Sequence, residues 1–197
     1  MSEQGQIDLF YGDESGVPCV PCVPCVPCVP CVPCVPCVPC VPYAWQFADE
    51  QVVMPSERGG VNCFALLSRD NRIHARLTQA TVTSAWISEH LDALSLSLPR
   101  PAVVVLDNAS VHTKAVKERR VVWQERGLFV FFLPTYSPHL NIAEVLWRKL
   151  KYEWLRPEDY ADKETLRLAV WQALTAVGKS LTIQFSALKT NAQDSLT

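Results

Sequence analysis

Three acidic residues stand at points of the chain where folding could bring them together. Asp13 and Asp107 each end a short apolar run that is typical of a β-strand, in FYGDESG and VVVLDNASVH. Glu144 opens an amphipathic helix in LPTYSPHLNIAEVLWRKLK. Carboxylates that meet in one pocket can hold a pair of divalent metal ions, and such a pair catalyses the cleavage of phosphodiesters. Mg²⁺ prefers oxygen ligands and usually takes only one or two carboxylates, so widely spaced acids suit it better than a dense acidic cluster.

These motifs resemble the catalytic domain of mariner-type bacterial insertion-sequence transposases, which are DDE superfamily endonucleases. The resemblance extends from about Ile7 to about Trp154 with one interruption, and the segment around Glu144 is its most specific part. Asp107 and Glu144 lie 37 positions apart, a spacing that the resemblance implies for the second and third acids. It also implies that Asp13, Asp107 and Glu144 are the catalytic ligands of two Mg²⁺ or Mn²⁺ ions. The implied activity is cleavage of DNA at insertion-sequence ends, followed by transfer of the cut strands into target DNA.

Each acid also has a simpler structural interpretation. Asp107 precedes a predicted helix and could cap the turn that leads into it. Asp13 has Glu14 as its neighbour, and because side chains alternate along a strand, we expect only one of the two to join the site. The resemblance selects Asp13. Asn141 and Glu144 have the spacing of a capping box, in which the glutamate would bind a backbone N–H instead of a metal ion.

Basic residues near these acids are candidates for contacts with DNA. Arg148 and Lys151 follow Glu144 at helical spacing on one face, where they could neutralise phosphates or form an ordinary solvated surface. Lys114 and Lys117 belong to the densest basic run of the chain, which has the same two interpretations. Four further residues are expected to support the site: Asn108, His112, His139 and Asn141.

The composition predicts one soluble domain. The chain has 197 residues with 18 Lys and Arg against 20 Asp and Glu, a net charge of −2. This length suits a single catalytic domain over residues 1–197, and the charge is unlike that of a free-standing DNA-binding module, so DNA contacts must come from local patches. No apolar run approaches the roughly 18 residues that cross a bilayer, and the polar start lacks the features of a secretory signal. We therefore expect a cytoplasmic protein without membrane contact.

A Val-Pro-Cys triplet recurs eight times between residues 17 and 40, and residues 17–42 are predicted to form an insertion between the first two strands. The tract holds eight of the nine cysteines, at a C-x-x-C spacing that could bind soft metal ions. Proline at every third position favours a polyproline II helix, in which successive cysteines lie about 9 Å apart on one face. That separation is too large for a shared zinc ion. We expect an irregular, polyproline-like loop, and a thiol-rich metal-binding protein remains an alternative function.

Periodicity and turn residues predict an α/β domain. Consecutive strands followed by alternating strands and helices match the ribonuclease-H-like fold that the resemblance implies, a mixed five-stranded sheet with flanking helices. We expect Ser110 to cap the second helix and Asn141 the third. The predicted strands are Ile7–Gly12, Tyr43–Phe47, Val61–Leu67, Ile73–Leu77, Val103–Leu106 and Leu128–Leu133, and the predicted helices are Thr83–Leu96, Val111–Arg126, Ile142–Trp154 and Lys163–Val177.

The resemblance also concerns what this chain lacks. Related transposases carry helix-turn-helix DNA-binding segments before the catalytic domain, whereas only 12 residues precede Asp13 here. We therefore expect a separate helix-turn-helix polypeptide, from an upstream or split reading frame, as a partner beside transposon ends and target DNA. A homodimer is a further option. The alternative is a catalytically inactive remnant that serves as a DNA-binding or interaction module.

Overall fold

Five strands form one mixed sheet at the centre of the computed structural model. The strand order is β3-β2-β1-β4-β5, with β2 antiparallel to both β1 and β3, and with β4 parallel to both β1 and β5. This is the ribonuclease-H-like sheet that was expected. The structure describes residues 6–19, 59–135 and 137–185. The strands are β1 (Asp8–Pro18), β2 (Gly60–Leu67), β3 (Ile73–Thr78), β4 (Ala102–Leu106) and β5 (Leu128–Phe132).

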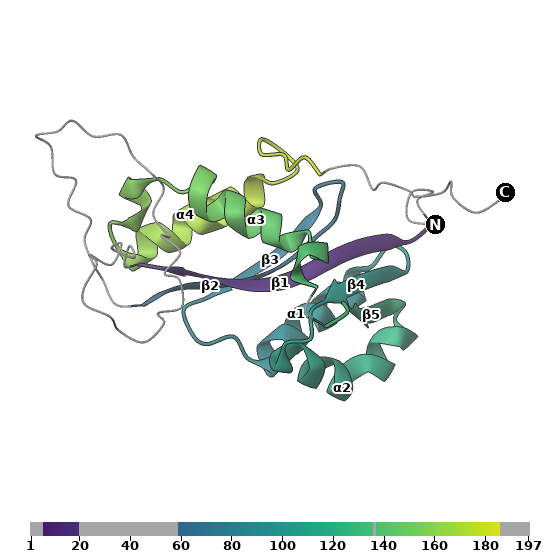
Figure 1. Ribbon diagram of the computed structural model, residues 1–197. Coiled ribbons are helices and arrows are strands. Elements are labelled where there is room, and N and C mark those ends of the chain that lie inside the picture. Colours follow the sequence, from purple (N-terminus) through teal and green to yellow (C-terminus); the bar gives the residue numbers. More distant parts are fainter. Residues whose placement is uncertain (1–5, 20–58, 136, 186–197) are drawn as a thin grey trace, which may run out of the picture.

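Helices cover both faces of the sheet. In Figure 1, α1 and α2 lie below it, and α3 and α4 lie above it. The helix predicted over residues 142–154 consists of two parts. The α-helix α3 ends at Lys149, and a π-helical turn, η2, continues it. No helix in the described residues is long and apolar enough to cross a membrane. The helices are α1 (Ser84–Ser97), α2 (Ser110–Glu125), α3 (Ala143–Lys149), η2 (Leu150–Trp154) and α4 (Lys163–Ala176), with 3₁₀ turns η1 (Pro138–Leu140) and η3 (Pro157–Tyr160).

The sheet separates two hydrophobic cores. Because side chains alternate along a strand, β1 contributes to both of them: Phe10 packs against α1 and α2, whereas Val17 packs against α3 and α4. β2 is apolar along most of its length, as suits a strand that is buried on both faces. The α1/α2 core includes Phe10, Phe64, Leu66, Ile87, Leu91, Leu106 and Trp123, and the α3/α4 core includes Val17, Cys63, Leu146, Leu150, Leu166 and Val170.

Most helix ends agree with the sequence signals. The Thr83 hydroxyl caps α1, and the Asp162 carboxylate caps α4. Gly127 follows α2 and Gly178 follows α4, at φ 81° and 77°, in the left-handed region that glycine adopts most easily. The predicted cap of α2 was wrong: Ser110 is the first helical residue and Ala109 precedes it, without a capping bond from its side chain.

A partly buried carboxylate joins the two helices of the lower layer. Asp92 on α1 accepts hydrogen bonds from Trp123 Nε1 at 2.7 Å and from Arg119 Nη2 at 2.7 Å, both on α2. Trp123 is fully buried, so its indole N–H depends on this acceptor. The cluster therefore fixes α2 against α1.

β1 is longer than the sequence predicted. The polar residues after Gly12 suggested a strand end, but β2 pairs with β1 from Tyr11 opposite Leu67 to Pro18 opposite Gly60, and this ladder sustains the strand. Asp13 therefore lies inside a strand and not at its end. The first residues of the predicted insertion, Val17 and Pro18, belong to β1. The rest of the tract from residue 20 and the strand predicted at residues 43–47 lie outside the described residues.

Burial of the first triplet predicts how the repeat can be shortened. Val17 and Cys19 are fully buried. Removing residues 20–40 keeps this triplet, and we expect the free energy of unfolding to stay close to that of the full chain. Removing residues 17–40 puts Val41 and Pro42 in the places of Val17 and Pro18, but it also puts Tyr43 in the place of Cys19. The larger side chain should destabilise the fold by about 1–3 kcal/mol through overpacking.

Urea unfolding of the two deletion variants measures this difference. The point variant Cys19→Tyr in the full chain is the matched control and should show the same loss as the longer deletion. Equal stability of the two deletions would contradict the placement of Cys19 in the core.

Candidate active site

Strand register brings the first two acids together. In the parallel pair of β1 and β4, Tyr11 lies opposite Val105. Asp13 and Asp107 each follow two residues later, so they are level where β4 ends and β1 continues. Asp107 directly follows β4, as predicted. Two carboxylates that are far apart in sequence thus become neighbours at the C-terminal end of β4, and α/β sheets commonly form their sites at such strand ends.

The Asp13 carboxylate occupies an environment that disfavours its charge. Burial, and then the negative charges of Glu14 and Asp107, raise the pKa of Asp13 to about 7. One oxygen, Oδ2, accepts a hydrogen bond from Nε1 of Trp147 on α3 at 3.1 Å. The neighbouring carboxylates repel one another, and a bound cation would relieve that repulsion.

Asp107 combines its predicted structural role with an open position. Its Oδ1 accepts a hydrogen bond from the Ala109 backbone N–H at 3.0 Å, which is the turn-capping contact that the sequence suggested. The same oxygen lies 2.6 Å from Nδ1 of His112. The side chain is nevertheless 45% exposed and borders a cavity of about 280 Å³, lined also by Asn108 and Leu133. One oxygen is therefore fixed while the carboxylate remains accessible.

Glu14 contributes to the site from the opposite face of β1. Alternation turns it toward α2, where its Oε2 lies 2.7 Å from Nε2 of His112. His112 is fully buried and lies between the Glu14 and Asp107 carboxylates. Burial alone would lower the pKa of His112, but the two carboxylates outweigh it and raise the pKa above its ordinary value. The expected alternation holds: Asp13 faces α3, and Glu14 faces α2, where it is linked to Asp107 through His112.

The sequence did contain a signal for this arrangement. His112 is spaced with Ala115, Val116 and Trp123 on the buried face of α2. A histidine on the inner face of a helix that starts just after Asp107 must point toward the sheet. The strand next to β4 in that sheet is β1. What the sequence could not show is the distance at which Glu14 meets it.

Asn141 fastens the start of α3 to the strand that carries Asp13. The buried Asn141 side chain donates from Nδ2 to the Gly12 carbonyl at 3.1 Å and accepts the Ala143 N–H at 3.1 Å. Asn141 lies one residue before the N-cap position, Ile142, and Glu144 forms no capping box there. The exposed Glu144 carboxylate is thus not used by the helix start. Trp147, which contacts Asp13, is one turn further along the same helix.

The donor set suits a hard divalent cation, although the ligands are not gathered into a cage. Within the described residues, no three His, Cys, Asp or Glu side chains form a ready metal cluster. Asp13 and Asp107 offer two carboxylates in electrostatic contact, which is the number that Mg²⁺ usually takes from a protein beside phosphate and water. Glu144 lies in the first turn of α3, the helix that contacts Asp13 through Trp147. The residues therefore fit Mg²⁺ or Mn²⁺ in type and number.

The other predicted residues have mixed placements. Asn108 donates from Nδ2 to the Leu133 carbonyl at 2.6 Å and so fixes the loop after β4 to the end of β5. His139 is exposed in η1. Burial raises the pKa of the Cys63 thiol to about 12, only slightly offset by the Lys151 charge, so this thiol is inert. The basic residues Arg148, Lys114 and Lys117 are exposed, and Lys151 is partly buried.

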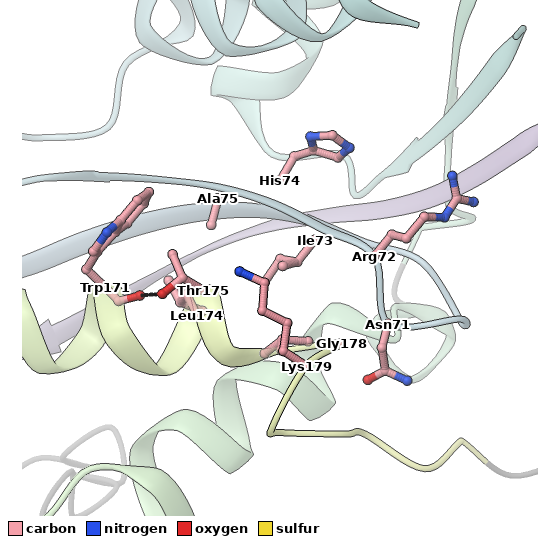
Figure 2. A pocket seen from close by; sticks show the side chains of 11 residues that line it. Asn71, Arg72, Ile73, His74, Ala75, Trp171, Leu174, Thr175, Gly178 and Lys179 are labelled. Carbon is pink, nitrogen blue, oxygen red and sulfur yellow. Dashed lines mark hydrogen bonds between the residues drawn. The ribbon is translucent and has the colours of Figure 1, made fainter. Parts of the chain in front are cut away.

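A larger cavity, of about 550 Å³, lies away from these acids, between β3 and the end of α4. Figure 2 shows its lining, in which Trp171 and Thr175 of α4 stand beside Ile73 and Ala75 of β3, with Lys179 across the opening. None of its lining residues is a carboxylate. The larger cavity therefore lacks the chemistry of the candidate site.

Comparison with known proteins identifies the family. The sequence profile of the DDE superfamily endonucleases matches residues 37–167, which are 131 of the 197 residues. The chain belongs to the DDE superfamily of endonucleases. The match includes Asp107 and Glu144, whereas Asp13 lies before it, on the other side of the Val-Pro-Cys tract. No curated protein sequence matches this DDE endonuclease significantly.

Solved structures share the fold of this DDE endonuclease at low sequence identity. The simian T-cell lymphotropic virus intasome, in complex with PP2A regulatory subunit B56 gamma, matches with a TM-score of 0.51 and 12% identity, over 95% of this chain and 60% of that chain. The Mos1 strand transfer complex matches with a TM-score of 0.49 and 14% identity, over 91% of this chain and 53% of that chain. The catalytic core domain of BIV integrase matches with a TM-score of 0.46 and 17% identity, over 62% of this chain and 78% of that chain. The chain thus spans little more than half of the Mos1 chain.

The tether at Asn141 is open to a direct test. In Asn141→Ala, the Gly12 carbonyl and the Ala143 N–H lose a buried partner, so the free energy of unfolding should fall by about 1–3 kcal/mol. Urea titration monitored by tryptophan fluorescence measures it. Asn108→Ala, at an exposed asparagine with one hydrogen bond, is the control and should cost less. A loss no greater than that of the control would show that α3 does not depend on this tether.

Proposed function

We propose that this DDE endonuclease is the catalytic domain of a transposase, which cleaves DNA at insertion-sequence ends and joins the cut strands to target DNA. The observation that carries the proposal is the level placement of Asp13 on β1 and of Asp107 just after the parallel strand β4, with Glu144 in the first turn of α3. Membership in the endonuclease family supports the same chemistry.

Asp13, Asp107 and Glu144 would hold two Mg²⁺ or Mn²⁺ ions. When bound, such ions activate the attacking hydroxyl and stabilise the leaving oxygen in an in-line displacement at phosphorus. The protein contributes the positions of the ligands. Trp147 holds Oδ2 of Asp13, Ala109 and His112 hold Oδ1 of Asp107, and Asn141 holds the helix of Glu144 against β1.

DNA would reach the site across exposed basic side chains of two helices. Lys114 and Lys117 lie on α2, which starts next to Asp107, and Arg148 lies one turn after Glu144 on α3. Lys151 follows in η2. Recognition of the insertion-sequence ends would fall to a helix-turn-helix polypeptide, with a second copy of the chain as a further partner, in the cytoplasm.

The thiol-rich alternative has less support. The first cysteine of the tract, Cys19, is fully buried in the α3/α4 core, as is Cys63. Neither thiol is placed to bind a metal ion from solvent.

Carboxylate variants test the proposed activity. Asp107→Asn and Glu144→Gln should each lower Mn²⁺-dependent nicking of DNA by about a hundredfold or more, since even the residues that support metal ligands are worth up to about that much. Circular dichroism should show an unchanged fold. Glu153→Gln, at an exposed glutamate paired with Lys149, is the matched control and should nick at the wild-type rate.

Two outcomes would oppose the proposal. Wild-type nicking by Asp107→Asn would remove this residue from the chemistry. A folded wild-type protein that does not nick DNA with either ion, but still binds it, would instead favour the inactive remnant.

The salt dependence of DNA binding tests the basic residues of α2. Each phosphate contact contributes about 0.9 to the slope of log K against log salt concentration, so Lys114→Ala with Lys117→Ala should lower the slope by about 2. Fluorescence anisotropy with a labelled duplex measures it. Arg167→Gln on α4, whose side chain pairs with Glu164, should leave the slope unchanged. An unaltered slope in the lysine variant would exclude these contacts.

A further inference from the structure

We infer that Glu14 and His112 are positioning residues, which hold the Asp107 carboxylate in the orientation needed to bind a metal ion. The inference rests on the proposed function and adds to it a glutamate that the three-acid motif does not include. The three side chains come from three elements: Glu14 from β1, His112 from α2, and Asp107 from the end of β4.

The two contacts of the imidazole define the arrangement. Nδ1 lies 2.6 Å from Asp107 Oδ1, and Nε2 lies 2.7 Å from Glu14 Oε2. The contact with Glu14 is within ion-pair distance without being an aligned hydrogen bond, and Oε2 and Nε2 have no other hydrogen-bond partner among the described residues. Because the nitrogens point away from each other on a rigid ring, Glu14 sets the angle of the ring and the ring sets the angle of Asp107.

The surrounding core allows the ring little freedom. His112 is fully buried, and the Phe64 ring packs against it at 5.8 Å between centroids. In β1, Gly12 is packed so closely that an added Cβ would lie 2.5 Å from Leu106 and 2.7 Å from Leu66. The strand that carries Glu14 therefore cannot shift easily relative to β4. The bridge from Glu14 through His112 to Asp107 therefore joins two closely packed strands.

The bridge matters because Asp107 is otherwise weakly held. Its side chain is half exposed, and the described residues fix it only through Oδ1, by His112 and by the Ala109 N–H. Partners that orient a ligand and hold it ready commonly change metal affinity by about 10- to 100-fold. Without His112, the carboxylate could rotate, and binding a cation would then require it to be ordered again.

Stability alone is a weak explanation for this bridge. A buried ion pair loses much hydration energy, and well-packed apolar residues often replace such a pair without loss of stability. A buried imidazole between two carboxylates, one of which is an expected metal ligand, is better explained by the orientation that it imposes.

Mn²⁺ affinity of the full chain without DNA provides the test. Isothermal titration calorimetry with MnCl₂ should show binding that is about 10- to 100-fold weaker in His112→Gln and Glu14→Ala than in wild type. Glutamine can contact Asp107 but cannot bridge to Glu14. Glu14→Gln keeps an oxygen for the ring, so its affinity should lie closer to wild type than to Glu14→Ala. In nicking assays, the half-saturating Mn²⁺ concentration should rise while the rate at saturating Mn²⁺ changes less.

Asp92→Asn provides the matched control for stability. It weakens the hydrogen bonds of a partly buried carboxylate between α1 and α2, away from Asp107, and should lower the unfolding free energy without changing Mn²⁺ affinity. Unchanged affinity in His112→Gln, with wild-type binding intact, would overturn the positioning role alone. Equal losses of Mn²⁺ affinity in Glu14→Gln and Glu14→Ala would overturn it too, because the negative charge of Glu14, and not its contact with the ring, would then determine the affinity. Absence of Mn²⁺ binding by the wild-type chain would overturn both this inference and the proposed function.

Discussion

The parallel pairing of β1 with β4 is the constraint on which the candidate site depends. It sets Tyr11 opposite Val105, and Asp13 and Asp107 follow at the level where β4 ends. A shift of one residue in this register would turn Asp13 toward α2 and Glu14 toward α3. Gly12 supports the register, because a Cβ at this position would lie 2.5 Å from Leu106 and 2.7 Å from Leu66, so that these side chains would have to move. Packing in the α1/α2 core therefore determines which acid faces which helix layer.

Several negative charges meet at this point, and the surrounding groups determine how they are held. Asp13 is partly buried close to Glu14 and Asp107, which raises its pKa. Trp147 supplies one N–H to Asp13, and His112 is shared between the other two carboxylates. The protein groups alone leave part of this negative charge without a counter-charge, and such a site is suited to a divalent cation. The electrostatic strain and the proposed chemistry thus have the same origin.

The Val-Pro-Cys tract shows how a repeat can adjoin a working fold. Its first triplet is incorporated into the protein: Val17 and Pro18 extend β1, and Cys19 is buried in the α3/α4 core. The ladder with β2 holds these residues, from Tyr11 to Pro18. Closing a longer loop costs little more free energy than closing a short one, because the cost rises only logarithmically with length. Both strands of the hairpin therefore form on either side of the tract.

The sequence by itself determined most of the local elements, Asp107 at the end of β4 and Glu144 in the first turn of α3. The apolar run before Asp107, the periodicity of α1, α2 and α4, and the glycines after α2 and α4 depend on neighbouring residues, so local patterns suffice to predict them. Only the tertiary structure decided the length of β1, the capping of α2, and the bridge from Glu14 through His112 to Asp107. These features depend on contacts between strands and helices that are far apart in the chain. No local pattern records the distance between Glu14 and His112, because core packing sets it.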